Sequence, residues 1–118
     1  MKNLILILFL MLIPLAIFSD FQFGKDLFND GLYEEAVVEF EKVISEYPTS
    51  DEAQKSLFFI GECYLKKDQF DKAEIAFKRL WNGYPQNAEK DKTLYQLALT
   101  QFHQEKYNDT IKILIFSL

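Results

Sequence analysis

The stretch DGLYEEAVVEFEKVISEYP, residues 30–48, decides the fold, and a second version of it, KDQFDKAEIAFKRLWNGYP, follows at residues 67–85. In the first version, the apolar residues at helical spacing are Tyr33, Ala36, Val37, Phe40, Val43, Ile44 and Tyr47. Their separations of three and four residues place them on one face of a helix. Pro48 and Pro85 close the two stretches, because proline cannot continue the hydrogen-bond ladder of a helix. Each stretch therefore predicts an amphipathic helix that ends at a proline.

The two stretches belong to a repeat with a period of 37 residues. The positions in register are Gly24, Gly61 and Ala98; Tyr33, Phe70 and Tyr107; Ala36, Ala73 and Thr110; and Phe40, Phe77 and Leu114. A further helical pattern precedes each stretch. In the second unit its residues are Leu57, Ile60, Gly61, Tyr64 and Leu65. The small residue at 24, 61 or 98 lets this first helix approach the second, and Phe40 or Phe77 fills the space beside it. We therefore expect an all-α solenoid of helix-turn-helix units.

The period divides the chain into about two and a half units, at residues 17–53, 54–90 and 91–118, with the last one incomplete. Thr49 and Glu52 have the spacing of a capping box, so we expect a first helix to begin after Thr49. The C-terminal end is apolar, with Ile111, Ile113, Leu114, Ile115 and Phe116. Repeat units bury their faces against their neighbours. This end therefore predicts either a fragment of a longer array or self-association through the open end.

The pattern of Gly or Ala, aromatic, Ala, aromatic and Pro resembles the tetratricopeptide repeat. The run from Phe28 to Phe77, with Asp30-Gly31-Leu32-Tyr33-Glu34-Glu35-Ala36 and Glu46-Tyr47-Pro48, more narrowly resembles the repeats of bacterial outer-membrane assembly lipoproteins. It is also similar to the repeat domain of the envelope protein that accompanies the Tol-Pal system. The resemblance covers nearly all of residues 20–118, the expected tetratricopeptide repeat domain. It implies a non-enzymatic interaction scaffold of the cell envelope, in outer-membrane protein assembly or envelope maintenance.

The first 19 residues have the character of a targeting segment. Residues 4–18 are an apolar run broken only by Pro14, and Lys2 is the only charge before it. This composition predicts a signal peptide over residues 1–19, removed after Ser19, and an exported, periplasmic or envelope-associated protein. Ile17 and Phe18 are bulky for a cleavage site, so an uncleaved anchor in the inner membrane is the alternative. Residues 4–18 would then be the only contact with the membrane.

The composition excludes several kinds of function. The formal net charge of −5 argues against a nucleic-acid partner, which would require a basic surface. His103 and Cys63 are each the only residue of their type, so no metal or cofactor site is predicted. We expect Cys63 to be buried. The carboxylates of Glu34, Glu35, Glu39 and Glu41 follow the polar face of a helix and point to water. We therefore expect no enzymatic activity.

The resemblance also implies a binding surface, because tetratricopeptide proteins bind peptides in a concave groove lined by their first helices. The matching positions are Phe21 and Lys25 in the first unit; Lys55, Phe58, Glu62, Leu65 and Lys66 in the second; and Lys92, Tyr95, Leu99, Phe102 and His103 in the third. The alternative interpretation is that the apolar members pack adjacent first helices together. The predicted function is thus capture of a peptide or partner subunit. The alternative function is a membrane-anchored structural or regulatory array within a larger protein.

Overall fold

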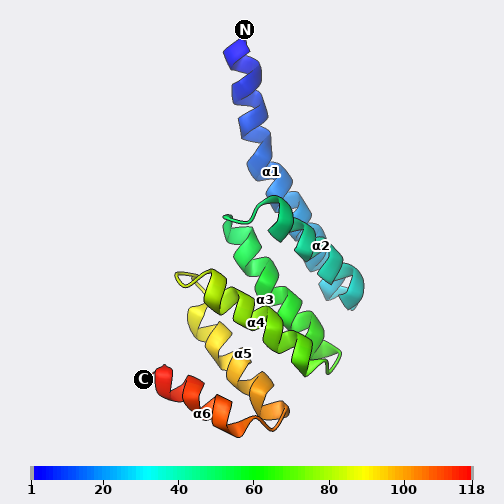
Figure 1. Cartoon of the computed structure of the whole chain (residues 1–118). Helices are drawn as coiled ribbons and strands as arrows, with labels where there is room; N and C mark the ends of the chain where they lie inside the picture. The colour runs from blue at the N-terminus through cyan, green and yellow to red at the C-terminus, as the bar shows by residue number, and fades with distance from the viewer. Residues whose placement is uncertain (1, 118) are drawn as a thin grey trace.

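The computed structural model describes residues 2–117, and for Tyr107 only the backbone. Every regular element in these residues is a helix (Figure 1). The helices are α1 (Lys2–Asn29), α2 (Tyr33–Glu46), α3 (Asp51–Lys66), α4 (Phe70–Gly83), α5 (Lys90–His103) and α6 (Tyr107–Phe116). The all-α prediction is confirmed, and α2 and α4 coincide with the two stretches that define the repeat.

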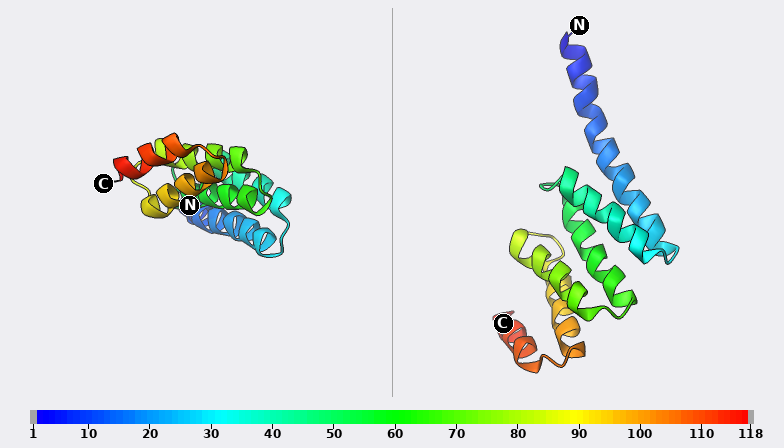
Figure 2. Two further views of the ribbon diagram at one scale, coloured as in Figure 1. Left: turned by 90° about the horizontal axis from the view of Figure 1, so that it is seen from below. Right: turned by 45° about the vertical axis from the view of Figure 1, so that its right-hand side comes forward.

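The helices stack in sequence as three antiparallel pairs, α1–α2, α3–α4 and α5–α6 (Figures 1 and 2). The first helices α1, α3 and α5 lie in one layer, where Phe21 contacts Phe59 and Glu62 contacts Gln96. The second helices lie in the other layer, where the Arg79 guanidinium pairs with the Glu41 carboxylate at 2.7 Å. The arrangement is elongated, 62 × 32 × 17 Å, with α1 at one end and α6 at the other. This is the predicted helical solenoid.

The turn within each pair has the same backbone conformation. Gly31, Asp68 and Glu105 are spaced by 37 residues, and all three have a positive φ, of 78°, 55° and 60°. In each turn the next residue donates its backbone N–H to a carbonyl five residues earlier, as Leu32 does to Leu27 at 2.9 Å. This is the hydrogen bond of a Schellman motif, which suits glycine and strains other residues mildly. The repeat thus extends to the backbone geometry of the turns.

The connection between α2 and α3 corrects one expectation. Ser50, and not Thr49, caps α3, because the Ser50 hydroxyl accepts the Ala53 N–H at 3.0 Å. The same hydroxyl donates to the Tyr47 carbonyl at 2.7 Å, which fixes it beside the end of α2. Pro48 follows α2 in this connection as predicted. The N-cap therefore lies one residue later than predicted, and the residue three positions on is Ala53, which cannot complete a capping box.

The core is built on contact between a small residue of the first helix and a phenylalanine of the second. A Cβ atom added to Gly24 would lie 2.7 Å from the Phe40 ring, and one added to Gly61 would lie 2.4 Å from the Phe77 ring. Both rings are fully buried. Only glycine leaves space for them, so the predicted pairing of small and aromatic residues is confirmed.

The N-terminal half of α1 projects from the stack (Figure 1). Consecutive residues from Leu4 to Leu10 are all exposed, so the helix is apolar on every side. Within the described residues α1 is the one helix long and apolar enough to cross a membrane, with a mean hydropathy of 2.6 over its best 18 residues. Pro14 does not interrupt it. The same helix then becomes the first helix of the repeat, where Phe21 and Gly24 are buried.

Candidate peptide-binding surface

The predicted groove residues form three equivalent strips, one on each first helix. The strips are Phe21 and Lys25 on α1, with Phe28 added here because it stands 37 residues before Leu65; Phe58, Glu62 and Leu65 on α3; and Tyr95, Leu99 and Phe102 on α5. Separations of four and three residues place the members of each strip on one face of its helix. The three strips differ in exposure. The most exposed rings are on α5, where Tyr95 is 67% and Phe102 55% exposed.

The strip on α1 is covered by α3. The ring of Phe59 lies 6.0 Å from Phe21 and 5.3 Å from Phe28, both edge to face. The Lys25 ammonium lies 5.9 Å from the centre of the same ring, within cation–π distance. Phe21 also packs on Phe40 and is buried. Phe21 is therefore a core residue and not a groove residue as predicted, because a following first helix closes over it.

The strip on α3 is partly covered by α5. The Gln96 side-chain amide donates a hydrogen bond to the Glu62 carboxylate, and Gln96 stands 37 residues after Phe59. Burial raises the pKa of Glu62 above its ordinary value, although the bond from Gln96 and the nearby Lys66 and Lys92 act in the opposite direction. Phe58 is half-buried against the Phe77 ring at 5.7 Å. Packing between helices, the alternative to peptide binding, thus accounts for part of the burial of Phe58.

The strip on α5 is the most accessible because no first helix follows α6 within residues 2–117. The remaining predicted residues lie around the strips. Lys55, Lys66 and Lys92 are exposed, and so is His103. The His103 ring stacks on Phe70 at 4.8 Å, at the edge of the surface. The structure brings these residues to one layer of the solenoid, but their role in binding stays a prediction.

Glu74 is a buried carboxylate that breaks the apolar pattern of its helix, and the sequence does not reveal its partners. It stands on the apolar face of α4 and accepts hydrogen bonds from Lys78 at 3.1 Å, Gln104 at 3.0 Å and Lys106 at 3.2 Å. Burial alone would raise its pKa, but the bonds from Lys78 and Lys106 outweigh burial and lower it. A charge on the apolar side of an amphipathic helix was the available signal. Its hydrogen bonds with Gln104 and Lys106 connect α4 to the α5–α6 turn.

Cys63 is fully buried, as expected, and burial raises the pKa of its thiol to about 12. A neutral buried thiol is unreactive. Among the described residues no group of three or more His, Cys, Asp or Glu could hold a metal ion. The carboxylates of Glu34 and Glu41 pair with Lys67 and Arg79 across neighbouring units. These carboxylates serve contacts between helices.

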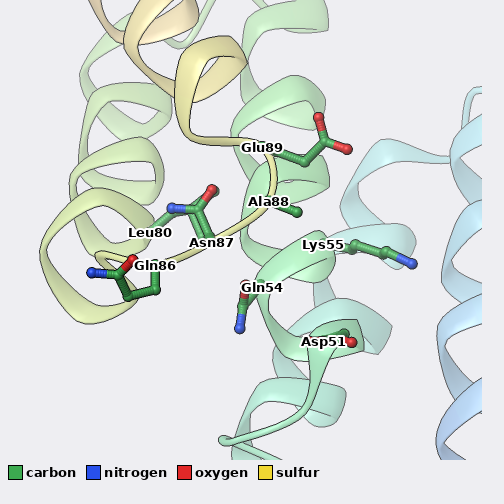
Figure 3. A pocket seen from close by; sticks show the side chains of 8 residues that line it. All are labelled: Asp51, Gln54, Lys55, Leu80, Gln86, Asn87, Ala88 and Glu89. Carbon is green, nitrogen blue, oxygen red and sulfur yellow. The ribbon is translucent and has the colours of Figure 1, made fainter. Parts of the chain in front are cut away.

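A cavity of about 290 Å³ lies between the start of α3 and the α4–α5 loop (Figure 3). Its lining residues are Asp51, Gln54, Lys55, Leu80, Gln86, Asn87, Ala88 and Glu89. Asn87 is buried and donates from Nδ2 to the Tyr84 carbonyl at 2.7 Å, while its Oδ1 has no hydrogen-bond partner. Asn87 stands 37 residues after the capping residue Ser50, but α5 begins only at Lys90. The α4–α5 loop is thus longer than the equivalent α2–α3 connection, and the cavity lies between this loop and α3.

Stacked helix pairs with a 37-residue period define a helical-repeat protein, and its first helix is apolar and exposed over its N-terminal half. The chain belongs to the YfiO family of outer membrane lipoproteins, whose model matches residues 19–112. No curated protein matches the chain closely enough to add to this assignment. The family match confirms the resemblance to envelope repeat proteins, and it begins where the apolar segment ends.

Proposed function

We propose that this protein is a non-enzymatic scaffold that captures a peptide segment of a partner protein on its first-helix surface. The process would be outer-membrane protein assembly or envelope maintenance. Membership of an outer membrane lipoprotein family supports the location. The observation that carries the binding role is the exposed strip on α5, with two large rings on one helix face. Exposed aromatic rings of this kind supply most of the binding energy when a partner covers them.

The chemistry of the surface favours an apolar internal segment over an acidic chain terminus. A clamp for a terminal carboxylate needs hydrogen-bond donors at the centre of the strips. Glu62 and Leu99 occupy those central positions on α3 and α5. Glu62 is itself an acceptor and is already bonded to Gln96. A segment with apolar side chains spaced to meet Tyr95 and Phe102 fits this surface better.

The test is the double substitution Tyr95→Ala and Phe102→Ala in the full chain. Both rings are exposed, so we expect the helical content to stay unchanged while partner capture falls at least about tenfold. Capture is measured by quantitative mass spectrometry of envelope proteins that copurify with the tagged chain. The matched control is Val38→Ala with Ile75→Ala, two exposed apolar residues of the second-helix layer. Equal capture by both double variants and the wild type would reject the binding role of the strip.

A membrane-anchored array is the second candidate, and the continuity of α1 favours it. Cleavage after Ser19 would make Phe21 the second residue of the mature chain. Its ring packs on Phe40 at 5.9 Å and on Phe59 at 6.0 Å. These contacts would weaken if the new N-terminal end of the helix frayed. The family is described as lipoproteins, whereas the only cysteine of this sequence is the buried Cys63. A retained apolar helix would supply attachment without a lipid.

The two forms differ in intact mass and in solubility. A retained anchor gives the full chain of 13.9 kDa, which resists extraction by carbonate washing. A cleaved form lacks residues 1–19 and is soluble. Ile17→Ala is the matched variant, because a small residue at this position completes a cleavage signal with Ser19. If the anchor is retained, only this variant should be shortened. A shortened wild-type protein would reject the anchor and leave the scaffold role intact.

A further inference from the structure

Asn87 in the α4–α5 loop makes only half of the contacts of its counterpart in the preceding unit. Ser50 stands 37 residues earlier, and its hydroxyl donates to the Tyr47 carbonyl at 2.7 Å and accepts the Ala53 N–H at 3.0 Å. Asn87 repeats the donation, from Nδ2 to the Tyr84 carbonyl at 2.7 Å. It caps no helix, because α5 begins later than the repeat predicts. Its Oδ1 therefore has no partner, although Asn87 is only 6% exposed.

The side chain that carries this unpaired oxygen lines the cavity between α3 and the α4–α5 loop (Figure 3). A buried acceptor without a hydrogen bond costs free energy, so the site gains from a ligand that supplies a donor. Gln54 of α3 and Gln86 of the loop line the same cavity. Three side-chain amides thus surround one space, and each amide carries both donors and an acceptor.

The charged residues around the cavity balance one another. Asp51 and Lys55 lie four residues apart on α3, and the Glu89 carboxylate pairs with the Lys92 ammonium at 3.2 Å. The Lys55 side chain extends away from Asn87 (Figure 3). A charged ligand would lose its hydration here without meeting an unbalanced opposite charge. The lining therefore favours a neutral group that donates one hydrogen bond and accepts another.

We propose that this cavity is a subsite for the main chain of a captured peptide, whose N–H donates to the Asn87 Oδ1 and whose carbonyl accepts from the Gln54 amide. The inference rests on the proposed capture of a peptide and adds a second contact region, since Lys55 belongs both to the cavity and to the predicted groove. The volume of about 290 Å³ lies just below the range of about 300–1,000 Å³ typical of small-molecule sites, so a short segment of a larger partner suits it. None of the lining residues is aromatic, so a sugar ring finds no flat wall.

The loop and its neighbours hold the subsite in shape. Tyr84 joins the two connections, because its carbonyl accepts from Asn87 and its hydroxyl donates to the Pro48 carbonyl at 2.5 Å. Leu80 is 1% exposed and supplies an apolar wall. All the lining residues lie between positions 51 and 89, in the middle of the chain. A site formed in advance loses less conformational entropy on binding. Since main-chain contacts do not depend on side chains, the subsite adds affinity without restricting the partner's sequence.

Nuclear magnetic resonance of the full chain in detergent micelles tests the proposal, with N-acetyl-trialanine N-methylamide as the ligand. This neutral peptide has main-chain amides but no large side chain. We expect saturable shifts of the Asn87 side-chain amide and the Ala88 backbone signals. Asn87→Ser should weaken binding about three- to tenfold, because serine can keep the bond to the Tyr84 carbonyl but withdraws the acceptor from the cavity. Asn82→Ser, the same change at an exposed position of α4, is the matched control and should bind like the wild type.

The other outcomes overturn the proposal in distinguishable ways. The absence of a saturable shift would mean that the cavity holds water only. Saturation by N-acetylglucosamine but not by the peptide would indicate a sugar site. Equal binding by Asn87→Ser and the wild type would place the peptide elsewhere. If Asn87→Ser does not fold, Gln54→Met removes the other amide at similar size and should weaken binding by a similar factor.

The same measurement separates this subsite from the proposed capture through α5. The double variant Tyr95→Ala and Phe102→Ala should bind the trialanine peptide unchanged, because this peptide has no large apolar side chain to meet those rings. Either proposal can therefore fail while the other holds.

Discussion

The interface between the first two units and the interface between the last two use the same geometry but different side chains. At the first, Phe59 lies among the rings of Phe21, Phe28 and Phe40. At the second, the equivalent residue is Gln96, which donates to Glu62. The helices still stack in the same way, and the pairing of a glycine with a phenylalanine sets the distance within the first two units. Contacts between units are therefore free to vary in chemistry.

The difference has consequences for stability. Aromatic packing excludes water and does not depend on pH, whereas the second interface buries polar groups that require partners. The buried polar residues there include Glu74, Thr93, Thr100 and Gln101, whereas the first interface buries Ser56. The Gln101 Oε1 and the Ser56 Oγ each have no hydrogen-bond partner. An unpaired buried acceptor costs free energy. We therefore expect α5 and α6 to open before α1 to α4, and the substitutions below compare the two regions.

The largest contrast is expected between Phe40→Ala and Leu114→Ala, which truncate equivalent positions. Phe40 is fully buried, so its removal leaves a cavity and should lower the free energy of unfolding by about 3–5 kcal/mol. Leu114 is half exposed, so its removal should cost less than about 0.5 kcal/mol in the isolated chain. Urea denaturation followed by circular dichroism measures both. If Phe40→Ala does not fold, Phe40→Leu should show the same order at a smaller cost.

A contrast between two glycines comes next. In Gly61→Ala the new Cβ would lie 2.4 Å from the buried Phe77 ring, so the helices must move apart. We expect a loss of about 1–3 kcal/mol, as for other overpacked sites. Gly83→Ala is the control, because nothing lies within 4 Å of its Cβ position and alanine favours a helix. It should be neutral or stabilise by up to about 1 kcal/mol. Equal effects of the two substitutions would mean that the small residue does not set the spacing.

Much of the fold could be predicted from the sequence because the same pattern of apolar and small residues recurs every 37 residues. The period identified the second helices, and the small residues at 24 and 61 identified the close contacts. The cap at Ser50 was missed because Thr49 offers the same hydroxyl one residue earlier. Spacing alone cannot decide between neighbouring capping residues. The backbone of the preceding turn decides, through the Tyr47 carbonyl.

The candidate site could be predicted only as a set of positions on a helix face. Phe21, Phe58 and Tyr95 are equivalent in the repeat, yet they are buried, half-buried and exposed in that order. Their exposure depends on which helix follows in the stack, which is a property of place in the array and not of the local pattern. The network around Glu74 was missed for a similar reason, since its partners Gln104 and Lys106 come from the next unit.

The smallest contrast is expected between two carboxylates that each join neighbouring units. Glu74→Gln removes a buried charge that Lys78 and Lys106 neutralise, and it should cost about 1–2 kcal/mol at pH 7. Glu41→Gln removes a half-exposed partner of Arg79 and should cost less than about 1 kcal/mol. Because the folded state lowers the pKa of Glu74, its contribution is complete above the unfolded pKa, near 4.5, and is lost as pH falls through the folded value. The unfolding free energies of wild type and Glu74→Gln should therefore converge in acid. A difference that stayed constant from pH 7 to pH 3 would show that the charge of Glu74 does not stabilise the second interface.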